Sequence, residues 1–153
     1  LTTGFLASPT VLLGGGYHIY DCGGDVIRGY EKAGAHLAGL IPPGARVYWK
    51  GGESAVPLLY LKDAVIFPPQ INSIYTFRTG GEADALARYG FWNEALARQW
   101  ADQADYILIE EGQYGGWLAD FLDSGTYNEL SPTPLTAPCR EDSGIHIYQK
   151  QRD

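Results

Sequence analysis

The sequence predicts an α/β fold, a three-layer sandwich whose mostly parallel sheet carries a C-terminal antiparallel edge strand. Helical and strand patterns alternate along the chain, which is typical of helices packed on both sides of a sheet. Residues 106–109 are continuously apolar, as a strand covered on both faces must be. A chain of 153 residues has the usual size of one domain with one core.

Helices are predicted at residues 30–41, 82–103 and 114–122, where apolar residues recur at the spacing of one helix face. A short helix is also predicted at residues 53–61, with Pro57 near its first turn. Pro42 directly follows the segment 30–41, and Gly125 lies shortly after the segment 114–122. Proline cannot continue a helix and glycine favours its C-terminal stop, so we expect both helices to end there. Gly90 lies inside the segment 82–103, where it predicts a kink or a division into two helices.

Strands are predicted where short apolar runs lie between turn residues, at residues 46–49, 64–67, 105–110 and 144–149. We expect the last of these strands to pair antiparallel at the edge of the sheet. Before it, residues 131–138 read SPTPLTAP and predict a proline-rich loop. Residues 70–81 predict another long loop, whose length and composition favour a functional role.

Residues 1–24 are predicted to be a segment of their own, in front of a single α/β domain at residues 25–153. The chain begins at Leu1 and contains no methionine, so we expect further residues before Leu1 in the parent protein. Residues 1–13 are apolar but shorter than the about 20 residues that cross a bilayer. They are either the outer end of a transmembrane helix or an ordinary strand and loop, followed by a glycine-rich linker.

Charge and cysteine content exclude several classes of partner. The formal net charge is -7 and no basic run exceeds a pair, so we expect no nucleic-acid partner. Cys22 and Cys139 either form a disulfide, which would place the domain outside the cytosol, or remain two free thiols. Neither cysteine has a CxxC neighbour, and no metal site is predicted.

Ligands of open α/β sheets bind at the carboxyl ends of the strands, which we expect here at residues 50–53, 67–70 and 110–114. No phosphate-binding glycine motif, HExxH or GxSxG is present, so we predict neither a cofactor nor a catalytic residue. Glu110 and Glu111 are adjacent on a strand and therefore point to opposite faces, which excludes a catalytic pair.

Aromatic and amide side chains near these strand ends favour binding of a sugar or a lipid headgroup, because rings cover apolar area while amides set orientation. Trp92 and Trp117 also lie on apolar helix stripes, so each is either core or ligand platform. The candidate ligand-binding residues are Lys50, Glu53, Gln70, Asn72, Tyr75, Arg78, Asn93, Glu110 and Tyr114.

The order of these elements, with the phrases PPGARVY at residues 42–48 and ADYILIEE at residues 104–111, resembles a known family. It is similar to the extracytoplasmic C-terminal domain of polytopic GT-C membrane glycosyltransferases, those related to dolichyl-phosphate-mannose protein mannosyltransferases. The similarity covers about residues 25–150 and includes no catalytic motif of that family.

The resemblance implies a domain on the extracytoplasmic side of a membrane, with the transmembrane part of the same chain as its partner. The parent enzyme would use a lipid-linked sugar donor, and its catalytic acidic residue would lie in the membrane part. The domain would then be non-catalytic. It would bind the acceptor or shape the roof of the active site, with a glycan or the lipid-linked sugar as its ligand.

Two other hypotheses stay open from the sequence. The first is a stand-alone extracytoplasmic module that binds carbohydrate or another partner. The second is a small α/β enzyme that works at the carboxyl edge of the sheet through Lys50, Glu53 or Glu110.

Overall fold

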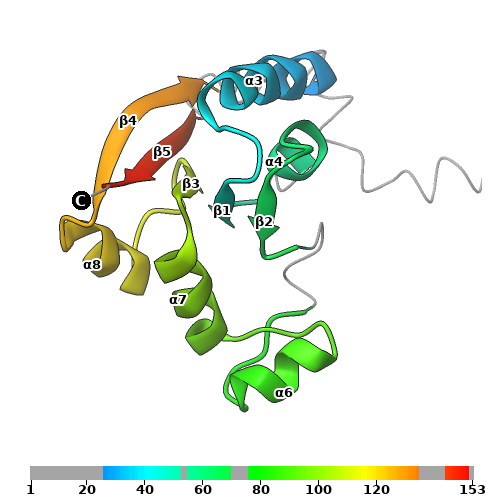
Figure 1. Cartoon of the computed structure of the whole chain (residues 1–153), viewed down its shortest axis with the longest axis vertical. Helices are drawn as coiled ribbons and strands as arrows, with labels where there is room; N and C mark the ends of the chain where they lie inside the picture. The colour runs from blue at the N-terminus through cyan, green and yellow to red at the C-terminus, as the bar shows by residue number, and fades with distance from the viewer. Residues whose placement is uncertain (1–25, 53–54, 70–75, 135–143, 152–153) are drawn as a thin grey trace, which may run out of the picture.

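The computed structural model describes residues 26–52, 55–69, 76–134 and 144–151 as an α/β fold with an open five-stranded sheet (Figure 1). The strands are β1 (Arg46–Lys50), β2 (Val65–Phe67), β3 (Tyr106–Glu110), β4 (Tyr127–Pro134) and β5 (Gly144–Lys150). The helices are α3 (Val26–Leu40), α4 (Ala55–Tyr60), α6 (Ala83–Arg88), α7 (Glu94–Gln103) and α8 (Trp117–Asp123). The α/β class predicted from the sequence is confirmed.

The N-terminal segment of residues 1–24 lies outside the described residues, and so do Cys22 and Cys139. Their predicted roles stay predictions. Among the helices of the described ranges, none is both long enough and apolar enough to cross a bilayer.

The sheet is mixed, whereas the sequence predicted a mostly parallel one. Its strand order is β2-β1-β3-β5-β4, with β1 parallel to β2 and β3, and β5 antiparallel to β3 and β4. A parallel pair requires a crossover, and α4 supplies it between β1 and β2, as α6 and α7 do on the way to β3. Strands β4 and β5 follow one another and pair directly, which adds an antiparallel half.

The prediction that the C-terminal strand forms the edge of the sheet is wrong. Strand β5 is antiparallel as predicted, but β4 pairs on its outer side. Residues 131–134 belong to β4, although the sequence predicted a loop there. Proline lacks an N–H and is therefore found in edge strands, so Pro132 and Pro134 are compatible with this position. The register between β4 and β5 shifts between Leu130 and Thr133.

The helix predicted at residues 82–103 is divided in two at Gly90, whose φ of 74° favours glycine. Helix α7 begins after Asn93, whose side chain accepts a hydrogen bond from the backbone N–H of Leu96 at 3.0 Å. Helix α6 contains no buried residue, and it projects away from the sheet beyond α7 (Figure 1).

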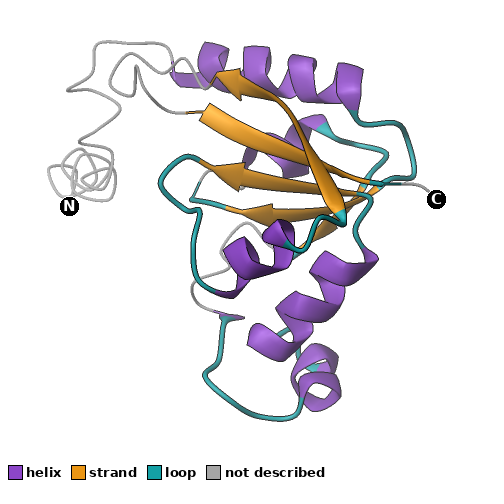
Figure 2. Ribbon diagram, turned by 90° about the vertical axis from the view of Figure 1, so that its left-hand side faces the viewer, coloured by secondary structure: helices purple, strands orange, loops and turns teal. Residues whose placement is uncertain are grey.

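Buried apolar side chains form two clusters on opposite faces of the sheet. Helices α3 and α4 pack on one face, and α7 and α8 pack on the other (Figure 2). Along β3, Tyr106 and Leu108 belong to the first cluster, and Ile107 and Ile109 to the second. All residues of β3 are buried, which confirms the prediction of a strand covered on both faces.

Tyr127 connects the start of β4 to the end of α7. Its buried hydroxyl lies 2.7 Å from the carbonyl oxygens of Ala101 and Ala104. Tyr127→Phe removes this donor, and we expect the free energy of unfolding to fall by about 1–3 kcal/mol in urea denaturation.

Tyr89→Phe is the matched control, because the Tyr89 side chain is 79% exposed. We expect its stability to stay within about 0.5 kcal/mol of the wild type. A Tyr127→Phe variant as stable as this control would contradict the assigned role.

Candidate functional site

A cleft of about 370 Å³ lies at the carboxyl ends of the parallel strands. Its described walls come from the end of β1 and the glycines after it, from Pro68 after β2, and from the loop after β3. The beginnings of α7 and α8 close the other side. The cleft therefore lies at the edge of the sheet where the sequence predicts a ligand site.

Aromatic side chains make up much of the cleft wall, namely Tyr48, Trp49, Phe77, Trp92 and Trp117. Trp92 and Trp117 also pack against the core cluster on the α7 and α8 face. The ring of Phe77 meets that of Trp92 edge-on, with 4.8 Å between centroids, and 6.1 Å separates the rings of Tyr48 and Trp117. Both tryptophans thus lie where the core meets the cleft.

The Trp92 ring is held in place by the segment that precedes α6. Its Nε1 donates to Oγ1 of Thr76 at 3.1 Å, and its backbone N–H donates to the Thr76 carbonyl at 3.0 Å. The backbone N–H of Arg78 in turn donates to the Trp92 carbonyl at 2.8 Å. This wall of the cleft is therefore preorganised by backbone pairing.

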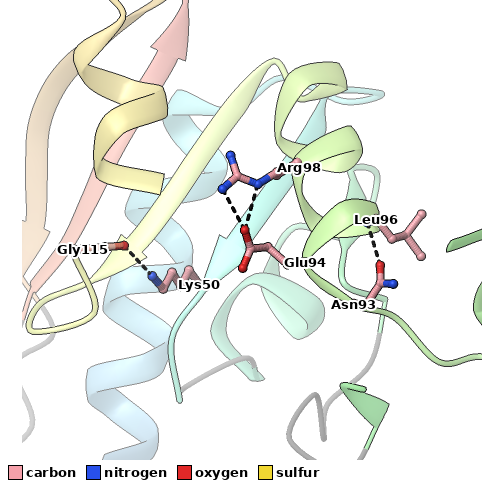
Figure 3. A network of polar contacts seen from close by, with 6 residues as sticks. All are labelled: Lys50, Asn93, Glu94, Leu96, Arg98 and Gly115. Atoms are coloured by element: carbon pink, nitrogen blue, oxygen red, sulfur yellow. Dashed lines mark hydrogen bonds and ion pairs between the residues drawn. The ribbon is translucent and has the colours of Figure 1, made fainter. Parts of the chain in front are cut away.

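Three polar side chains line the described part of the cleft, Lys50, Glu94 and Gln113. Nζ of Lys50 donates to the carbonyl of Gly115 at 3.1 Å, and burial lowers the pKa of the Lys50 amine. Oε1 of Glu94 accepts from Nε and Nη2 of Arg98, at 3.0 and 2.7 Å. Figure 3 shows the Lys50 ammonium pointing toward Gly115 and the Glu94 carboxylate pointing toward Arg98.

Arg98 contacts both Glu94 and Trp117, two residues that line the cleft. Its guanidinium carbon lies 4.8 Å from the centroid of the Trp117 ring, while the same group holds Glu94. A guanidinium over an indole face is a cation–π contact. Arg98 therefore orients two side chains that line the cleft.

Glu110 borders the cleft from a buried position at the end of β3, with 6% of its surface exposed. Its Oε2 accepts a hydrogen bond from the backbone N–H of Gly52 at 2.6 Å. A Cβ atom on Gly51 would lie 2.7 Å from the Glu110 carboxylate and from Cζ2 of Trp49. The loop after β1 passes so close to both side chains that position 51 requires glycine.

Glu110 and Glu111 occupy different surroundings. The Glu111 side chain is 54% exposed, and its Oε2 lies 3.9 Å from Nε2 of His146 on β5. Nδ1 of the same histidine lies 2.9 Å from Oε1 of Glu129. The two adjacent carboxylates therefore do not meet in the cleft.

Of the candidate residues named from the sequence, Lys50 lines the cleft and Glu110 borders it. Glu53, Gln70, Asn72 and Tyr75 lie outside the described residues. The remaining three candidates are absent from the described lining of the cleft and contact other residues, namely Arg78, Asn93 and Tyr114.

Asn93 caps α7 and donates through Nδ2 to the carbonyl of Gly81 at 2.8 Å. Arg78 lies over the ring of Phe91, with its guanidinium carbon 4.1 Å from the centroid. Tyr114 donates its hydroxyl to Oδ1 of Asp123 at 3.2 Å. These contacts give the three residues structural roles.

Tyr48 and Glu94 line the cleft but were not candidates in the sequence analysis. Tyr48 lies two residues before Lys50 on β1, so strand alternation could have placed it on the same face. Glu94 is the first residue of α7, and its position depends on a crossover that no local pattern reveals.

The described lining supplies rings for apolar contact, and a cation and a carboxylate for hydrogen bonds. These are the groups with which ligand pockets recognise partly polar molecules. Within the described ranges, no group of three or more His, Cys, Asp or Glu side chains is placed to hold a metal ion.

Gly51→Ala tests the close packing at the end of β1. Its methyl group must displace the Glu110 carboxylate or the Trp49 ring, so we expect a loss of about 1–3 kcal/mol of stability. Gly39→Ala in α3 is the control, since nothing lies within 4 Å of its added Cβ. A helix favours alanine over glycine by about 1 kcal/mol, so this variant should melt at a higher temperature. Equal melting temperatures for the two variants would refute the packing argument.

Comparisons with known proteins leave this geometry as the main basis for a functional interpretation. No family model matches the chain, and neither does a curated protein or a solved structure.

Proposed function

We propose that this domain binds a carbohydrate in the cleft and does not itself catalyse a reaction. The observation that carries the proposal is that Trp92 and Trp117 line one cleft together with Lys50 and Glu94. Aromatic rings pack against the apolar face of a sugar ring, while a few fixed polar groups set its orientation. The cleft has both kinds of group at the edge of the sheet where ligands bind.

The polar groups suit sugar hydroxyls, which both donate and accept hydrogen bonds. An ammonium has three donors, and the described contact of Lys50 with Gly115 uses one of them. Both hydrogen bonds from Arg98 to Glu94 end on Oε1, which leaves Oε2 to accept from a ligand. A sugar between the two side chains can therefore accept from Lys50 and donate to Glu94.

We further propose that the domain is the soluble extracytoplasmic part of a membrane glycosyltransferase that uses a lipid-linked sugar donor. The resemblance of residues 42–48 and 104–111, and of the order of elements, supports this assignment. The transmembrane part of the same chain would be the partner of the domain, and the cleft would hold the acceptor glycan. A three-layer arrangement is part of the proposal, supported by core clusters on both faces of the sheet.

Titration of the 153-residue chain with neutral disaccharides, followed by tryptophan fluorescence, tests carbohydrate binding. Trp92→Ala should raise the dissociation constant about 5- to 10-fold, because it removes a ring contact worth about 1–1.5 kcal/mol. Trp92→Phe keeps an aromatic ring and should retain most of the affinity. In the full-length parent, Trp92→Ala should raise KM for the acceptor and leave kcat nearly unchanged.

Tyr89→Ala is the control, because this exposed ring is absent from the described lining of the cleft. Its affinity should equal that of the wild type. Failure of the wild-type chain to bind any sugar would overturn the proposal. So would an affinity of Trp92→Ala equal to that of the control, provided that both variants melt cooperatively.

A further inference from the structure

The ammonium group of Lys50 lies half-buried in the cleft, and no described residue gives it a counter-charge. Its hydrogen-bond partner is the neutral carbonyl of Gly115 at 3.1 Å. In the part of the chain that the structure describes, no carboxylate lies within ion-pair distance of Nζ. A cation that is partly removed from water and faces a neutral acceptor attracts a negative charge more strongly than an exposed lysine does.

The carboxylate on the opposite wall does not supply that charge. Oε1 of Glu94 receives two hydrogen bonds from Arg98, and the shorter of them measures 2.7 Å. Arg98 also lies over the Trp117 ring, so its guanidinium is held beside the cleft. Among the described residues, two cations and one carboxylate therefore lie around the aromatic rings. Their summed charge is positive, although the formal net charge of the chain is -7.

Glu110 borders the cleft, but its side chain points to the opposite face of the sheet from that of Lys50. In the parallel pairing of β1 with β3, Lys50 aligns with Ile109, whose side chain belongs to the core cluster on the α7 and α8 face. Glu110 is the next residue of β3 and points to the opposite face. Its Oε2 is already bound to the backbone N–H of Gly52.

We infer that the ligand of this cleft is an acidic carbohydrate, whose anionic group binds the ammonium of Lys50 while its sugar ring packs against Trp92 and Trp117. The inference rests on the proposed carbohydrate function and narrows its ligand class. The shared chemistry is a carboxylate or a phosphate on a sugar. A charge-assisted hydrogen bond is about twice as strong as a neutral one, so the anionic group should dominate the selectivity.

The test compares matched monosaccharides on the 153-residue chain by NMR chemical-shift titration, which measures weak affinities. The probes are glucose, glucuronate and glucose 6-phosphate, with inorganic phosphate as the anion without a sugar. We expect at least one of the acidic sugars to bind about 10-fold or more tighter than glucose. The acidic sugar that binds more tightly identifies the natural anionic group as a carboxylate or a phosphate. Added salt should reduce the preference for the acidic sugar over glucose.

Three variants separate charge from structure. Lys50→Met should abolish the preference for the acidic sugar. It should weaken glucose binding less, because glucose loses only a hydrogen bond to an uncharged acceptor, whereas the acidic sugar loses a charge-assisted one. Lys50→Arg keeps the positive charge and should keep most of the preference for the acidic sugar. If the lysine stem acted only through packing, retention of the charge would not preserve this preference. Lys32→Met is the control, because Lys32 is an exposed residue of α3 and is absent from the described lining.

The outcomes distinguish this inference from the proposed function. Equal affinities for glucose and both acidic sugars would overturn the inference and leave carbohydrate binding intact. An acidic preference that survives in a folded Lys50→Met variant would also overturn it. Inorganic phosphate that binds as tightly as glucose 6-phosphate, without binding of glucose or glucuronate, would overturn both proposals, since the sugar ring would then contribute nothing. Failure of every sugar to bind would likewise overturn both.

Discussion

Burial of strand β3 on both faces is the constraint on which the rest of the structure depends. Successive side chains of a strand point to opposite faces, so Leu108 packs toward α3 and α4 while Ile107 and Ile109 pack toward α7 and α8. Neither helical layer can shift without opening a gap in its cluster, because protein interiors are close-packed. The position of β3 therefore fixes both layers, and with them the carboxyl edge that carries the cleft.

The same packing gives the cleft its shape. Trp92 and Trp117 pack against the core and also line the cleft, so their rings are held before any ligand arrives. Trp92 donates hydrogen bonds to Thr76 and accepts one from the backbone N–H of Arg78, and these bonds hold its ring in place. A rigid wall lowers the entropy lost on binding and so favours tighter binding. The core and the site thus share residues, so a substitution at these positions changes the stability of the domain as well as its binding.

Local patterns predicted the elements well and their long-range pairing less well. The continuous apolar run of β3 and the stop at Gly125 follow from local sequence, and both are confirmed. Strand β4 was missed because Pro132 and Pro134 have the composition of a loop, whereas an edge strand tolerates prolines. At the site, the strand-end rule identified Lys50. It could not identify Glu94, whose place depends on how the crossover through α7 packs on the sheet.

The parallel and the antiparallel strands of the mixed sheet have different roles. The parallel strands β2, β1 and β3 all end at one edge, so the loops after them converge although they are distant in sequence. The antiparallel strands β5 and β4 extend the sheet and complete both core faces without contributing to the described lining of the cleft. Changes in the converging loops, except at Gly51, can therefore alter which ligand binds without disturbing β3. Changes in the antiparallel half act on the ligand only through the stability of the shared core.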